Sequence, residues 1–216
     1  MPTPCEPPRH CPLCPRLFEY RSQNQAQHPD WWNGPAPSFG DPVARLLIVG
    51  LAPGKSGANR TGRPFTGDHA GILLYQTLIK TGFADGIYGA RPDDDLRLID
   101  CMVTNAVRCA PPGNKPTPAE EATCRPFLTA RIEALPQLEV IIALGEVARR
   151  NVWRALGGKP GPAIGHAGEA DVGGFHLISS YHCSRLNTQT GRLTPQMFER
   201  VFNRARALLG AQKAIG

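Results

Sequence analysis

Long apolar runs are missing from this sequence. The longest, such as Val140–Leu144, fall far short of the roughly 20 residues that a membrane-spanning helix needs. The segment Met1–Cys14 lacks the apolar core of a secretory signal peptide, and no internal repeat is present. We therefore expect a cytoplasmic protein with no membrane partner.

Acidic residues are in the minority. The 24 Lys and Arg residues against 18 Asp and Glu give a formal net charge of +6 and an isoelectric point near 9.1. This excess suits an anionic partner such as nucleic acid, although a basic surface kept for solubility explains it equally well. The arginines gather at Arg60 and Arg63, at Arg149 and Arg150, and at Arg185 and Arg192.

The chain of 216 residues is long enough to bury the core of one α/β domain over residues 1–216. Its apolar runs are continuous rather than alternating, which predicts parallel strands covered on both faces. The strand candidates are Arg45–Gly50, a strand within Leu98–Val107, Val140–Leu144 and Phe175–Ser180.

Helix signals separate these strands. Thr117 and Glu120 form a capping box with Pro118 at the first helical position. The expected helices run from Asp68 to near Gly82, from Thr117 to about Ala134, from Glu146 to about Leu156, and onward from Thr194. The alternation predicts a three-layer α/β/α sandwich with a central four-stranded parallel sheet, whose ligand crevice lies beyond the carboxyl ends of the strands. Residues 1–42 are proline-rich and are expected to be extended.

Cysteines favour a metal site. Disulfides are unexpected in a cytosolic chain, so metal binding is the better interpretation of seven cysteines. Cys11 and Cys14 form a C-x-x-C pair, while Cys109 and Cys124 form a second pair that the N-terminal segment can approach. Four thiolates suit zinc or an iron–sulfur cluster, and spacing does not choose between them. Buried, inert cysteines are the alternative.

A glycine-rich loop follows the first strand. The segment Gly50–Ser56 resembles a phosphate-binding P-loop, but three residues rather than four separate its glycines, and no helix follows directly. A nucleotide hydrolase is therefore the weaker interpretation. The glycines allow a ligand to approach the backbone closely. Phe65 is a candidate stacking plate for a base, with burial in the core as the alternative.

Four segments resemble the family 5 (type B) uracil-DNA glycosylases. They are C-P-L-C-P-R-L-F-E-Y-R (11–21), G-L-A-P-G-K-S-G-A-N-R-T-G-R-P-F-T-G-D (50–68), T-N-A-V-R-C-A-P-P-G-N-K-P-T-P (104–118) and Y-H-C-S-R-L-N-T-Q-T-G-R-L-T (181–194). The resemblance runs from about residue 11 to 205. Two positions depart from the family pattern: Gly54, where alanine is more usual, and Cys183, where many members have proline or another residue.

The resemblance implies a monomeric DNA-repair enzyme. Such enzymes remove uracil, and also hypoxanthine and other deaminated bases, from double-stranded DNA by base flipping. The family also carries a structural [4Fe–4S] cluster, which the matching motifs assign here to Cys11, Cys14, Cys109 and Cys124. Zinc in the same site is the alternative.

Hydrolysis of a base from deoxyribose passes through an oxocarbenium-like sugar and a departing anionic base. We expect His182 to donate a hydrogen bond to the leaving uracil and Asn105 to read its Watson–Crick edge. Asp68 is the candidate for stabilising the sugar cation or placing water, although an ordinary helix cap explains it too. The helix N-terminus is expected to keep this carboxylate ionised.

The other predicted site residues surround these three. The base pocket is expected to use Gly50, Leu51, Ala52, Asn59 and Phe65. The predicted DNA contacts are Arg60, Arg63, Ser184, Arg185, Leu186, Asn187, Thr188 and Arg192, with Arg185 and Leu186 as a wedge into the duplex. More active relatives carry a water-orienting group at the position of Leu51, so a damage sensor without turnover is the alternative function.

Overall fold

The structure is a computed structural model that describes residues 4–211. Its main sheet has six strands in the order β1-β5-β2-β6-β8-β7. The strands of this sheet are β1 (Phe39–Gly40), β2 (Leu46–Gly50), β5 (Cys101–Asn105), β6 (Val140–Leu144), β7 (Glu169–Val172) and β8 (Phe175–Ser180). A second sheet pairs β3 (Ala84–Asp85) with β4 (Arg97–Leu98).

The four central strands are parallel, as predicted, and an antiparallel strand is added at each edge. The predicted count of four strands is therefore too low for the whole sheet. β1 is only two residues long, and β7 is largely exposed, so neither strand has the continuous apolar run that revealed the central four.

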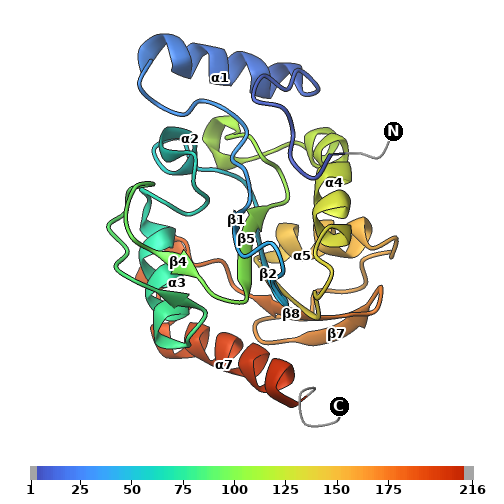
Figure 1. The fold of residues 1–216 in the computed structure, drawn as a ribbon. Coiled ribbons are helices and arrows are strands. Elements are labelled where there is room, and N and C mark those ends of the chain that lie inside the picture. Colours follow the sequence, from blue (N-terminus) through green and yellow to red (C-terminus); the bar gives the residue numbers. More distant parts are fainter. Residues whose placement is uncertain (1–3, 212–216) are drawn as a thin grey trace.

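Two helical layers cover the sheet, which confirms the predicted sandwich (Figure 1). The helices are α1 (Pro15–Gln27), α2 (Ala58–Thr61), α3 (His69–Lys80), α4 (Pro118–Glu133), α5 (Glu146–Ala155), α6 (Arg185–Gln189) and α7 (Pro195–Ala211), with a short 3-10 turn η1 (Pro112–Asn114). Leu46 and Ile48 of β2 pack with α3 and α7, while Leu47 and Val49 pack with α4 and α5. Alternate residues of one strand thus serve opposite cores.

The predicted helix starts are observed. The Asp68 side chain accepts a hydrogen bond from the Gly71 amide at the start of α3. Thr117 and Glu120 complete a capping box at the start of α4. None of the helices within residues 4–211 is long and apolar enough to cross a membrane.

The N-terminal segment contradicts its prediction. Residues 1–42 were expected to be extended, but Pro15–Gln27 forms helix α1. The face of α1 that is buried consists of Leu17, Arg21 and Asn24, at helical spacing but mostly polar. A hydrophobic pattern cannot reveal such a helix, because only one of these three residues is apolar.

Candidate active site

A cavity of about 510 Å³ opens at the carboxyl ends of the central strands, which is where the predicted crevice lies. Its size suits a small ligand such as a nucleobase. It is lined by Leu51, Ala52, Gly54, Lys55, Ser56, Gly57, Asp68, His69, Ala70, Asn114, His182, Ser184 and Arg185. The loops after β2 and β8 and the start of α3 therefore meet at one place.

Asn105 ends β5 opposite Gly50, at the edge of the sheet where the cavity opens, although neither residue lines the cavity. Its side chain is 2% exposed, and its Oδ1 has no hydrogen-bond partner among the described residues. A Cβ on Gly50 would lie 2.5 Å from this oxygen and 2.4 Å from the Phe65 ring, so only glycine fits there. A buried amide oxygen without a partner is costly and points to a ligand that supplies a donor.

Phe65 is buried and belongs to the core on the α3 side of the sheet. Its ring faces the His182 ring, with centroids 6.0 Å apart and planes at 29°. Its backbone has a φ of +53°, in the left-handed region that bulky residues rarely occupy. The burial that was the alternative for Phe65 is therefore observed, and its ring lies next to Asn105 and His182.

Asp68 points one carboxylate oxygen at its helix and the other at the glycine loop. Oδ1 accepts from the Gly71 amide at 3.2 Å. A Cβ on Gly57 would lie 2.3 Å from Oδ2, and a Cβ on Gly54 would lie 3.3 Å from it. The glycine loop therefore leaves the carboxylate room inside the cavity, and Gly54, unusual for the family, gives more room than alanine.

Burial is the largest influence on the pKa of Asp68 and on the pKa of His182. It raises the pKa of Asp68, although the Gly71 and Ala70 amides and His69 act in the opposite direction. Desolvation is the largest effect, so the pKa of Asp68 rises even though the carboxylate caps α3. Burial also lowers the pKa of His182 to about 4, which leaves the imidazole neutral at physiological pH.

The segment that includes α6 carries several predicted DNA contacts. Leu186 is 70% exposed, as a wedge residue must be. Asn187 Nδ2 donates to the His182 carbonyl at 2.8 Å and so holds the base of this segment. Arg192 lies over the Tyr181 ring at 4.6 Å.

His69 is a cavity residue that the sequence did not reveal. Its Nε2 lies 3.0 Å from Thr188 Oγ1, which links the start of α3 to α6. Its position directly after Asp68, at the end of the second matching motif, was the available signal.

Gly50, Phe65 and Asn105 adjoin one another but do not line the cavity, and two further predicted site residues face other segments. Asn59 is fully buried and its Nδ2 donates to Asn33 Oδ1 at 3.0 Å, so it faces the N-terminal segment and not the cavity. Arg63 is 5% exposed and pairs with Asp94, so the phosphate contact expected of it is not supported. Arg60, three residues earlier, is exposed.

The four cysteines of the predicted metal site surround one small cavity beneath α1. Cys11, Cys14, Cys109 and Cys124 line it together with Arg21, and all four are free. Burial, with neighbouring cysteines adding to it, raises the pKa of Cys14 to about 11 and that of Cys109 to about 12. No group of three or more His, Cys, Asp or Glu side chains within residues 4–211 is arranged to hold a single metal ion.

A family model described as the uracil DNA glycosylase superfamily matches residues 37–206. This range contains the cavity, Asn105 and His182, so the match covers the site as well as the fold. The chain therefore belongs to the uracil DNA glycosylase superfamily.

Individual relatives narrow this class. The chain is 44% identical over 207 residues to the type-5 uracil-DNA glycosylase of Thermus thermophilus, covering 93% of this chain and 94% of the relative. It is 41% identical over 213 residues to the type-5 enzyme of Mycobacterium tuberculosis, covering 94% and 79%. The type-4 enzyme of Thermotoga maritima matches only 48% of this chain, at 40% identity. The chain belongs to the type-5 uracil-DNA glycosylases.

Proposed function

We propose that this protein hydrolyses the bond between uracil and deoxyribose in DNA, after flipping the nucleotide into the cavity beside Asn105. The observation that carries this proposal is the buried Asn105 Oδ1 without a partner, next to Phe65 and Gly50. An amide has both a donor and an acceptor, so it can pair with the N–H and the carbonyl of one base edge. The family membership of the chain supports the same activity.

His182 stabilises the departing base. It lies at the end of β8, faces Phe65 and lines the cavity. Because burial keeps the imidazole neutral, one ring N–H donates to the uracil carbonyl oxygen on which negative charge develops. Phe65 packs against the face of the base.

Asp68 acts on the sugar. Its carboxylate lies in the cavity between the glycine loop and α3. When ionised, it stabilises the positive charge that develops on deoxyribose and orients the attacking water. Leu51 also lines the cavity but has no polar group for water, whereas Asp68 is the only carboxylate among the lining residues.

The surrounding segments hold the duplex. Exposed Leu186 fills the space that the flipped nucleotide leaves, and Arg60 and Arg185 meet phosphates. We extend the substrate range to hypoxanthine, because Asn105 can also pair with the edge of a deaminated purine.

The cysteine cavity fits a [4Fe–4S] cluster. Four free thiols surround it, which is a ligand set that a cluster uses, with zinc as the alternative. Cys11, Cys14, Cys109 and Cys124 would hold the cluster. Its role would be structural, tying the start of α1 to α4 and to the segment before α4. A brown protein with four equivalents of iron and no zinc is the expected result.

The test of the activity uses duplexes that carry uracil, hypoxanthine or neither, followed by alkaline cleavage at abasic sites. We expect cleavage at uracil and a loss of roughly 100-fold or more in Asn105→Ala, because one preorganised polar partner is removed. Asn203→Ala, at an exposed position on α7, is the matched control and should keep full activity. A folded, DNA-binding protein that releases no base would instead support the damage-sensor alternative.

A further inference from the structure

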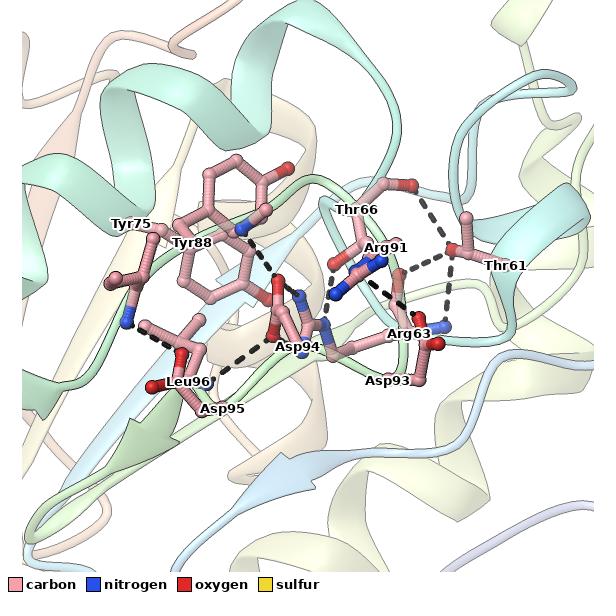
Figure 2. A network of polar contacts seen from close by, with 12 residues as sticks. Thr61, Arg63, Thr66, Tyr75, Tyr88, Arg91, Asp93, Asp94, Asp95 and Leu96 are labelled. Carbon is pink, nitrogen blue, oxygen red and sulfur yellow. Dashed lines mark hydrogen bonds and ion pairs between the residues drawn. The ribbon is translucent and has the colours of Figure 1, made fainter.

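A buried ion pair anchors the segment that contains Phe65. The Arg63 guanidinium makes two hydrogen bonds to the Asp94 carboxylate, of 2.6 and 2.7 Å, and the two side chains are 6% and 4% exposed (Figure 2). Arg63 Nε also donates to Thr66 Oγ1 at 2.7 Å. The pair therefore fixes both ends of the short segment that contains Phe65.

Asp94 belongs to the long loop between β3 and β4. The loop fastens its carboxylate with two of its own amides, from Gly89 at 2.8 Å and from Leu96 at 3.3 Å. The carboxylate thus receives four donors and presents a fixed acceptor to Arg63, and these hydrogen bonds lower its pKa despite burial. We call residues 86–96 the brace loop.

The brace loop also supplies Tyr88, whose hydroxyl holds the backbone at Phe65 and at Gly67. It donates to the Phe65 carbonyl at 3.1 Å and accepts from the Gly67 amide at 3.4 Å. The Tyr88 ring packs on Tyr75, with centroids 4.7 Å apart, and Tyr75 donates to the Pro64 carbonyl. Two tyrosines therefore hold consecutive carbonyls of one segment.

This arrangement explains how Phe65 keeps a positive φ. A bulky residue in the left-handed region is strained, and it stays there only when its surroundings determine its backbone. Here Tyr88 fixes the Phe65 carbonyl and the Gly67 amide, Tyr75 fixes the Pro64 carbonyl before Phe65, and Arg63 anchors the segment. The ring is thereby directed toward Gly50, Asn105 and His182.

We propose that Tyr88 is a positioning residue for base recognition: through the backbone of residues 65–67 it sets the plane against which the flipped base packs. This inference rests on the proposed function, because it gives Phe65 a base as its partner. It adds that the brace loop, outside every matching motif, determines how well the base is held.

The test compares Tyr88→Phe with Tyr20→Phe, a partly buried tyrosine on α1 that loses the same single atom. We expect Tyr88→Phe to lower the single-turnover rate of uracil release roughly tenfold, since small misplacements of a reacting group have effects of this size. Inhibition by free uracil should weaken by a similar factor. Affinity for a duplex with a stable abasic-site analogue should stay within twofold, because no base is present to pack on Phe65.

The outcomes separate the two proposals. If the wild-type protein releases no uracil, the proposed function is wrong and this inference falls with it. If the wild type is active but Tyr88→Phe equals Tyr20→Phe in rate and in inhibition by uracil, only the positioning role is overturned. Equal losses for uracil and abasic duplexes, with a lowered thermal midpoint, would show a merely structural role and also overturn it.

Discussion

Two segments that border the same cavity are held in different ways. Residues 63–68, which we call the braced wall, are anchored by a buried ion pair and by tyrosine hydroxyls from distant parts of the chain. Residues 184–190, which we call the α6 wall, are held mainly by hydrogen bonds within the segment and expose Leu186 to 70%. Among the described residues, one side-chain hydrogen bond joins the two regions, between His69, just after the braced wall, and Thr188.

The difference matches what each wall must do. A group that packs on the reacting base is useful only within a narrow range of positions, which favours anchoring by buried contacts. A wedge must adapt to a duplex whose local shape varies, and exposed segments with local contacts open at low free energy. The contrast predicts large stability effects behind the braced wall and small ones in the α6 wall.

The largest effect is expected when the negative charge of Asp94, which anchors the braced wall through Arg63, is removed. In Asp94→Asn the Arg63 guanidinium stays buried without its counter-ion, so we expect a loss of about 3–5 kcal/mol in the free energy of unfolding. Uracil release should fall as well, because the segment around Phe65 loses its anchor. Urea unfolding and single-turnover kinetics measure the two effects.

Asp93 is the matched control. Its carboxylate is 77% exposed and lies 3.6 Å from Arg91, so Asp93→Asn should change the free energy of unfolding by less than about 1 kcal/mol. Equal effects of the two substitutions would mean that burial of the Arg63–Asp94 pair does not stabilise the braced wall.

These two walls also show where sequence reasoning ends. Arg60 and Arg63 look equivalent in the sequence, yet one is exposed and the other is buried against Asp94, 31 positions away. No periodicity links a loop residue to a partner at that distance. Asn59 was misplaced for the same reason, since its partner Asn33 lies in the N-terminal segment.

What the sequence does reveal is local. The central strands are visible as continuous apolar runs, and the caps at Asp68 and Thr117 need only neighbouring residues. Asn105 and His182 could be placed at the crevice because each directly follows or ends a strand of the parallel sheet. The helix α1 was missed because its buried face is polar, so its packing depends on partners elsewhere.

A pH profile sharpens the comparison, because Asp68 lies in the braced wall and His182 lies next to the α6 wall. Burial raises the pKa of Asp68, in the braced wall, and lowers the pKa of His182, next to the α6 wall, to about 4. The reactive pair, an ionised Asp68 with a neutral His182, is therefore lost only on acidification. The value of kcat/KM should therefore fall on the acid side, by about tenfold per pH unit once Asp68 gains its proton.

The profile must be measured at constant salt, because DNA affinity depends on ionic strength. A value of kcat/KM that did not fall on acidification would contradict the role given to an ionised Asp68.

The smallest effect on stability is expected in the α6 wall. Leu186 is exposed, so Leu186→Ala should change the free energy of unfolding by no more than about 0.5 kcal/mol. The substitution should instead change the rate of uracil release from duplex DNA. Filling the gap matters most where a stacked, paired uracil must leave the duplex, so release from a U·A pair should fall roughly fivefold, and release from single-stranded DNA should not change.

The control for this change is Ile99→Ala, another exposed apolar residue, which precedes β5 and so lies at the opposite end of the strands from the cavity. It should leave both substrates unaffected. If Leu186→Ala slowed release from single and double strands equally, Leu186 would act on the bound base and not on the duplex. The two walls would then share one task, because an exposed, locally held segment would be positioning the base as the braced wall does.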